Sequence, residues 1–94
     1  MAADLDTAKL SELRSLVAEA AAVETAHAHG RLTAAYVDGQ RDDIRQALEK
    51  LLTDPALKPW AEGALAALDR GDAAALGRAR DRLVAMERTL GRGA

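Results

Sequence analysis

The sequence predicts an all-α protein in which four helices pack as two antiparallel hairpins into a small helical bundle. Residues that favour helices dominate, with 23 alanines and 14 leucines among 94 residues, whereas β-branched and aromatic residues are scarce. Large apolar residues recur at spacings of three and four, which is typical of one face of a helix. Glycines, prolines and short polar residues divide the chain into four segments with short connections, and these favour antiparallel neighbours.

The first helix is expected from about Leu5 to His29. Asp4 or Asp6 can cap its start, because a short carboxylate accepts hydrogen bonds from the free N–H groups of the first turn. Gly30 suits the left-handed position that ends many helices. The expected apolar face consists of Leu13, Leu16, Val17, Ala20, Val23 and His27.

The second helix is expected from about Ala34 to Leu52, with Thr33 as its N-cap. Leu32 and Val37 flank this start at the spacing of a hydrophobic staple. Gly39 lies in a polar stretch and costs about 1 kcal/mol relative to alanine inside a helix, so a kink there is an open alternative. The expected apolar face consists of Val37, Ile44, Ala47, Leu48, Leu51 and Leu52.

The third helix is expected from Pro59 to Arg70, after a turn over residues 54–59. Two prolines four residues apart cannot both lie inside a regular helix, whereas one proline suits the first helical position. Gly71 ends this helix. Its inward-facing residues are expected to be Trp60, Ala64, Leu65 and Leu68.

The fourth helix is expected over residues 73–90, with Asp72 as its cap and Gly91 and Gly93 ending the ordered part. Residues 1–4 and 91–94 are expected to fray. The length allows a single helical domain over residues 1–94. The expected apolar face of this helix consists of Leu76, Ala79, Leu83, Met86 and Leu90.

One alternative merges the first two helices. The spacing of three and four continues from Leu13 to Leu51, which would give one long helix. The seam positions in its middle would include His27, Gly30 and Arg41, and such residues make a poor helix–helix seam. The stop signal at Gly30 and the cap that follows it therefore favour two helices.

The composition indicates a thin core. Hydrophobic residues make up 49% of the chain, but about half of them are alanines, and there is one Trp, one Tyr and no Phe. Because alanine buries little area, we expect narrow helical faces that a second chain completes, in a homodimer or small oligomer.

Several classes of chemistry find no support in the sequence. The absence of cysteine excludes disulfides, thiolate metal sites and a cysteine nucleophile. The start of the chain lacks the pattern of a secretory signal, and no apolar run is long enough to cross a membrane, so a cytoplasmic location is expected. The two serines lie outside any nucleophile elbow, no glycine-rich phosphate loop is present, and no cofactor is indicated. We therefore expect a protein that is not an enzyme.

Glu24 and His27 form the sharpest candidate site. A Glu-x-x-His spacing places both side chains on one helix face, and di-iron bundles use it. A symmetric dimer would have to supply the second motif. In the alternative interpretation, His27 borders the core and Glu24 is solvated or pairs with it.

A protein–protein interaction module, such as an adapter, a chaperone or a regulatory subunit, is the function that the sequence favours. The chain has a net charge of −2, but its part from Arg70 onward carries six arginines against three acids. Nucleic-acid binding by this arginine-rich last helix is a further alternative, although Asp81 and Glu87 reduce its field. Candidate interface residues are Trp60, Tyr36, Leu76, Leu83, Met86 and Leu90.

Overall fold

The protein is an all-α bundle, which confirms the predicted fold class. A computed structural model describes residues 6–93, and for residues 92 and 93 only the backbone. The helices of this part are α1 (Thr7–Ala28), α2 (Ala34–Leu51), α3 (Lys58–Arg70) and α4 (Ala73–Gly93). α1 and α2 are separate helices, so the merged helix is excluded. Asp4 and the expected fraying of residues 1–4 lie outside the described residues.

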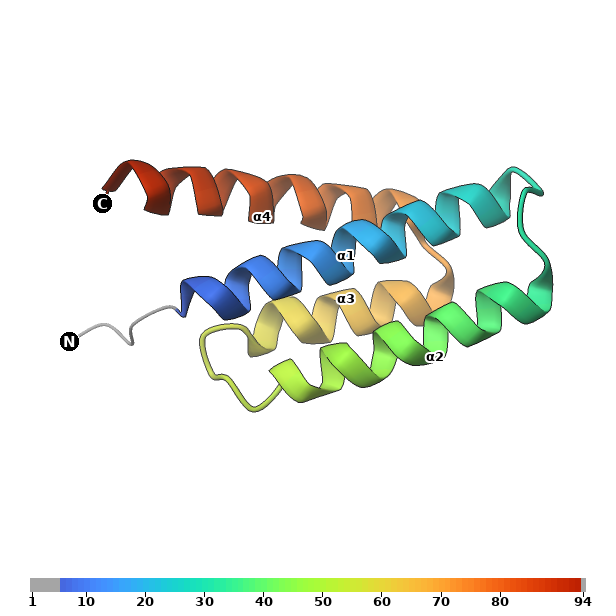
Figure 1. Cartoon of the computed structure of the whole chain (residues 1–94), viewed down its shortest axis with the longest axis horizontal. Helices are drawn as coiled ribbons and strands as arrows, with labels where there is room; N and C mark the ends of the chain where they lie inside the picture. Colours follow the sequence, from blue (N-terminus) through green and yellow to red (C-terminus); the bar gives the residue numbers. More distant parts are fainter. Residues whose placement is uncertain (1–5, 94) are drawn as a thin grey trace.

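Consecutive helices run antiparallel, so the chain goes up, down, up and down through the bundle (Figure 1). α1 packs against all three other helices, whereas α2 and α4 do not touch within the described part of the chain. The cross-section is therefore a rhombus in which α1 and α3 approach each other across the short diagonal. Among neighbouring helices, α4 packs most extensively against α1 and least extensively against α3.

The predicted signals at the start of α1 and at both ends of the α1–α2 connection are confirmed. The Asp6 carboxylate accepts hydrogen bonds from the backbone N–H groups of Ala8 and Lys9, at 3.0 and 3.2 Å. Gly30 has a positive φ of 69° after the last turn of α1. The Thr33 hydroxyl accepts from the N–H of Tyr36 at 3.2 Å, which starts α2. α2 then passes through residue 39 without a break.

The bounds of α3 and the turn between α3 and α4 agree with the sequence prediction to within one residue. α3 begins at Lys58, one residue before the proline that was predicted to start it. Gly71 ends α3 with a φ of 64°, and the Asp72 carboxylate accepts from the N–H of Ala75 at 3.0 Å. The predicted end of the last helix is wrong, because α4 continues through Gly91 to residue 93.

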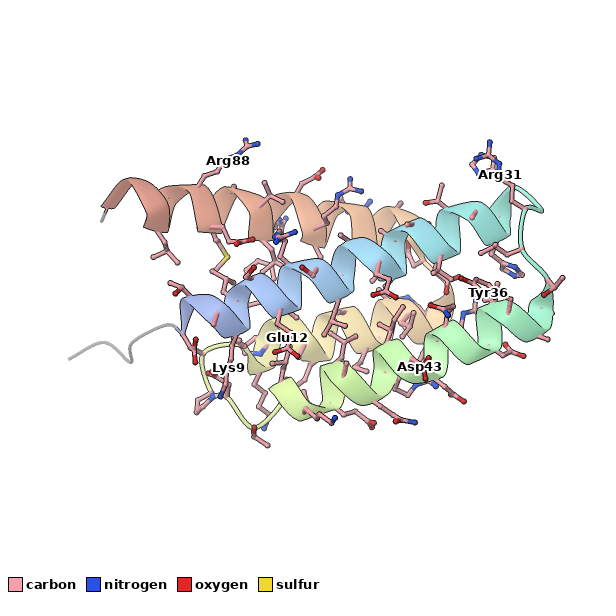
Figure 2. The ribbon with its side chains drawn as sticks, viewed as in Figure 1. Lys9, Glu12, Arg31, Tyr36, Asp43 and Arg88 are labelled. Carbon is pink, nitrogen blue, oxygen red and sulfur yellow. The ribbon has the colours of Figure 1, made fainter. Side chains whose placement is uncertain are left out.

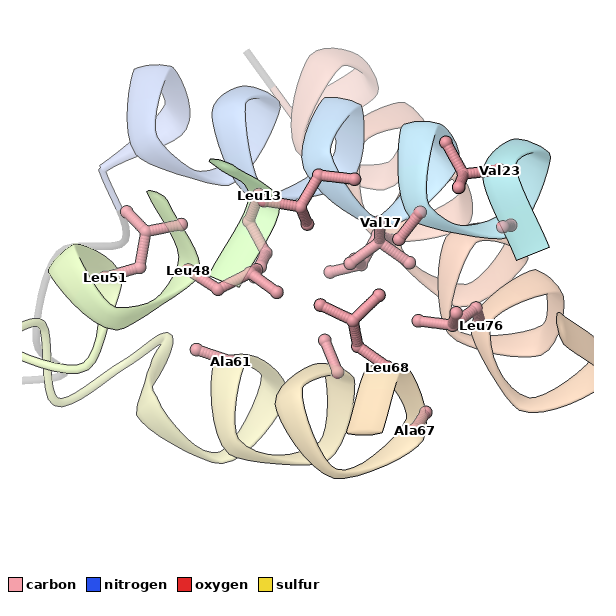
Figure 3. Close-up of a cluster of buried hydrophobic side chains, with 14 of the residues drawn as sticks. Leu13, Val17, Val23, Leu48, Leu51, Ala61, Ala67, Leu68 and Leu76 are labelled. Carbon is pink, nitrogen blue, oxygen red and sulfur yellow. The ribbon is translucent and has the colours of Figure 1, made fainter. Parts of the chain in front are cut away.

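The core lies along the bundle axis. Side chains of Leu13 and Val17 from α1, Leu48 from α2, Leu68 from α3 and Leu76 from α4 point into a common interior (Figure 3). Five alanines of the described part are buried among them, and their small size lets the backbones approach closely. These are Ala20, Ala21, Ala61, Ala64 and Ala67.

Two residues of the predicted apolar faces are exposed. His27 is exposed, because the packed interior ends at Glu24, whose carboxylate lies beneath the turn at Gly71. Leu90 is 39% exposed. α4 has 21 residues and the antiparallel α3 has 13, so the last turns of α4 extend beyond the first residue of α3. No helix in the described range combines the length and the apolar character that a membrane crossing requires.

Replacing Gly71 with alanine should destabilise the protein more than replacing Gly30. Both glycines have a left-handed backbone, for which a Cβ costs about 1–2 kcal/mol. At Gly71 the added Cβ would also lie 3.2 Å from Nη2 of Arg41 and 3.3 Å from Oε1 of Glu24, whereas at Gly30 nothing lies within 4 Å. Urea denaturation of both variants measures the difference, and equal losses in the free energy of unfolding would contradict this packing.

The Asp72 cap should make part of the stability depend on pH. The hydrogen bond from the Ala75 N–H, followed by the charges of Arg70 and Arg78, holds the pKa of Asp72 below its usual value. The carboxylate therefore stabilises the fold above the pKa of the unfolded chain, about 3.9, and this contribution is lost as the pH falls through the lower folded pKa. Asp72→Asn keeps an acceptor without the charge. We expect its melting temperature to lie below that of the wild type at neutral pH and to converge with it in acid.

Candidate functional site

Glu24, the first predicted site residue, lies in a buried ion pair. Its side chain is 1% exposed, and its two oxygens accept hydrogen bonds from Nε and Nη2 of Arg41, both at 2.6 Å. Arg41 is 26% exposed, and its Nη1 lies 4.0 Å from the Asp38 carboxylate. The hydrogen bonds to Glu24 raise the pKa of Arg41. Such a two-pronged pair fixes geometry as well as charge, so it joins α1 to α2.

His27 does not complete a site with Glu24. Its side chain is exposed in the last turn of α1. Within residues 6–93, no three His, Cys, Asp or Glu side chains are grouped closely enough to hold a metal ion. The metal site across a dimer stays a prediction, and an ion bound there would have to displace Arg41 from both oxygens of Glu24.

Charged pairs join three of the four sides of the bundle. The pairs are Glu24–Arg41 between α1 and α2, Arg14–Glu87 between α1 and α4, and Arg45–Asp69, at 2.8 Å, between α2 and α3. Between α3 and α4, the described residues make only the pair of Arg70 with Asp72, at 3.6 Å, and this pair spans the turn rather than the two helices. The α3–α4 side is thus the least tightly closed.

A groove of about 400 Å³ lies along this side, and we call it the α3–α4 groove. Trp60 and Pro59 lie at one end of it, where α3 begins. Trp60 is half-buried and packs against the core. Small side chains make up most of the lining between the helices, namely Gly63, Ala64 and Ala67 on α3 and Ala75 and Ala79 on α4.

Arginines supply all the charge of the groove lining. Arg70 lies at its far end, and Arg78 and Arg82 line it from α4, one helical turn apart. None of the described acidic residues lines the groove. Among the residues that the structure describes, Arg78 and Arg82 have no partner in an ion pair. The groove therefore combines an apolar floor, one aromatic side chain and positive charge.

The predicted interface residues are spread over the molecule. Leu76 and Leu83 are fully buried against other helices of the same chain, so they present no surface to a second chain. Tyr36, 52% exposed, lies at the start of α2, at the opposite end of the bundle from the start of α3 (Figure 2). Met86 and Leu90 line a shallow apolar depression of about 310 Å³ on the last turns of α4. Of the predicted interface residues, Trp60 and the fully buried Leu76 line the α3–α4 groove.

The arginines of α4 do not form one face. Arg80 pairs with Asp81 at 3.1 Å. Arg88 points away from the other helices (Figure 2). Only Arg78 and Arg82 share the groove, and the side chain of Arg92 lies outside the described part. Binding to nucleic acid through this helix stays a prediction. Because its arginines point in different directions, only a few of them could contact one nucleic acid at the same time.

The spacing of residues on α3 also indicates the groove in the sequence. Gly63, Ala67 and Arg70 were not among the candidate residues, yet they follow Trp60 at spacings of three, four and three. This spacing places all four side chains on one face of a helix. A tryptophan followed by two small residues and an arginine on one face indicates a shallow apolar channel with a charged end.

The fold is a small four-helix bundle, and the α3–α4 groove leaves one of its four sides open. Comparison of the chain with protein-family models, with curated proteins and with solved structures finds no match.

Arg41→Ala should destabilise the protein more than Glu24→Ala. Without Arg41, the buried Glu24 carboxylate has lost both of its hydrogen bonds, and an unpaired buried charge costs about 3–5 kcal/mol. Without Glu24, Arg41 can turn to solvent, because it is already 26% exposed, and the loss should be about 1–3 kcal/mol. Chemical denaturation measures both losses. The reverse order would show that the pair is not buried as described.

Proposed function

We propose that this protein is a non-enzymatic interaction module that binds a partner protein in the α3–α4 groove. The observation that carries the proposal is the groove itself, which brings Trp60 and two arginines to the edge of an apolar channel, and neither arginine has an ion-pair partner among the described residues. Tryptophan and arginine are the residue types that most often contribute strongly to protein–protein binding. Their neighbourhood on an otherwise small-residue surface supports a binding role.

The size of the groove favours a modest and reversible interaction. Its volume of about 400 Å³ is at the lower end of what binding sites offer, and its open shape gives contact on one side of a partner. Interfaces of small area are typical of transient complexes. This supports the role of an adapter or a regulatory subunit that exchanges partners.

Self-association is proposed at a different place, the end of α4. There, the helix extends beyond α3 and leaves Leu90 39% exposed beside Met86. Two copies could cover these side chains by packing the last turns of their α4 helices together. This contact would leave the α3–α4 groove accessible.

Filling the groove should abolish partner binding without unfolding the chain. In Gly63→Leu, the new side chain enters the groove, and no atom lies within 4 Å of its Cβ. Gly39→Leu is a matched control, because Gly39 is also a helical glycine with open space around it, but on α2. Leucine favours a helix over glycine by up to about 1 kcal/mol, so both variants should fold at least as well as the wild type.

Each immobilised variant is used to capture proteins from a lysate of the source cells. We expect at least one protein to bind the wild type and Gly39→Leu and to be lost with Gly63→Leu. Light scattering on the same variants should show unchanged self-association. Identical captures by all three forms would overturn the proposed groove.

A further inference from the structure

We propose that the occupant of the α3–α4 groove is an amphipathic helix of a partner protein, with acidic residues beside its apolar stripe. This inference rests on the proposed function and names the chemistry of the partner. It follows from the shape of the groove, from its hydrogen-bonding capacity and from its charge.

The shape of the groove matches a helix. On α3, the lining runs from Pro59 to Arg70, which is roughly 16 Å at about 1.5 Å per residue. Three turns of a helix have this length. The floor is lined by glycine and alanine, so the backbone of a third helix can approach α3 and α4 closely while its larger side chains enter between them.

The backbone chemistry of the floor disfavours an extended peptide. Both walls are helices, so most of their backbone N–H and C=O groups along the groove are already paired within α3 and α4. A strand laid on this floor would lose water from its own backbone groups and gain no partner for them, at a cost comparable to a lost hydrogen bond for each group. A helix satisfies its backbone internally and incurs no such loss.

The charge of the groove selects an acidic partner. Arg70, Arg78 and Arg82 line it, whereas no carboxylate of residues 6–93 does. Glutamates that flank an apolar stripe would meet Arg78 and Arg82 while the stripe covers the alanines and contacts Trp60. Guanidinium–carboxylate pairs at such an edge add specificity and accelerate association.

A second copy of this chain does not fit the groove. In a two-fold symmetric dimer, the same surface meets itself, so the arginines of one copy would face those of the other. The acidic exposed face of α2 offers only one large apolar side chain, Tyr36, among its described residues. Packing that face into the groove of the next copy would also build an open chain of molecules instead of a closed dimer.

The test uses three synthetic helical peptides without tryptophan. The first has leucines at spacings of three and four with flanking glutamates, the second has lysines in place of the glutamates, and the third is a scrambled form of the first. Trp60 is the only tryptophan of the chain, so its emission reports on the groove directly. Anisotropy of a labelled peptide gives the affinity.

We expect the acidic peptide to bind, to shift the Trp60 emission and to bind more weakly as salt is added. The lysine peptide and the scrambled peptide should not bind. Arg78→Glu combined with Arg82→Glu should weaken binding of the acidic peptide at least about tenfold, which corresponds to about 1.4 kcal/mol. Arg88→Glu is the matched control, because Arg88 lies on the same helix outside the groove, and it should leave the affinity unchanged.

Four outcomes would overturn this inference. They are binding of the lysine peptide or the scrambled peptide as tight as that of the acidic one, no binding of any peptide, tighter binding of a single-chain carboxylate such as dodecanoate, and open-ended self-association that Gly63→Leu abolishes. If the capture experiment still yields a partner lost with Gly63→Leu, the proposed function stands and only the acidic helix is wrong. If no such partner is captured, both proposals fail.

Discussion

Close approach of α1 to its three neighbours is the constraint on which the rest of this bundle depends. With no phenylalanine and a single tryptophan, the chain cannot fill wide spaces between helices. Its interior is therefore built from leucines set between buried alanines, and such an interior closes only where backbones come near each other. α1 meets α2, α3 and α4, whereas α2 and α4 do not meet within the described residues. Packing is therefore most extensive around α1, and of the two sides that α1 does not form, the α3–α4 side is packed less extensively.

The α3–α4 groove is the consequence of this arrangement. α4 packs more extensively against α1 than against α3. Ion pairs reinforce each of the other three sides in the described part, but none crosses from α3 to α4. The small residues that allow close packing inside the bundle leave a shallow channel where they face outward. Trp60 then borders that channel, because α3 begins at its end.

Local signals made most of the fold predictable. Asp6, Thr33, Asp72 and the two left-handed glycines act within a few residues of themselves, and each predicted role was confirmed. The roles of Glu24 and Leu90 depend on distant elements. Glu24 lies in the core because Arg41, 17 residues away, meets it, and spacing within one helix cannot show this. Leu90 is exposed because α3 is shorter than α4. The groove also depends on two elements, α3 and α4. The sequence therefore indicated it only through the spacing of residues on α3.

Binding and folding are linked in such a molecule. A partner that binds only the folded state stabilises it by mass action, by about 2.7 kcal/mol at a concentration one hundred times its dissociation constant. An acidic helix in the α3–α4 groove would add apolar area beside Trp60 and would place carboxylates opposite Arg78 and Arg82. It would thereby give the fourth side of the bundle the two kinds of contact that the other three sides have within the chain. The α3–α4 side is thus the place where such a partner would add most to the stability of the bundle, because the packing within the chain is least extensive there.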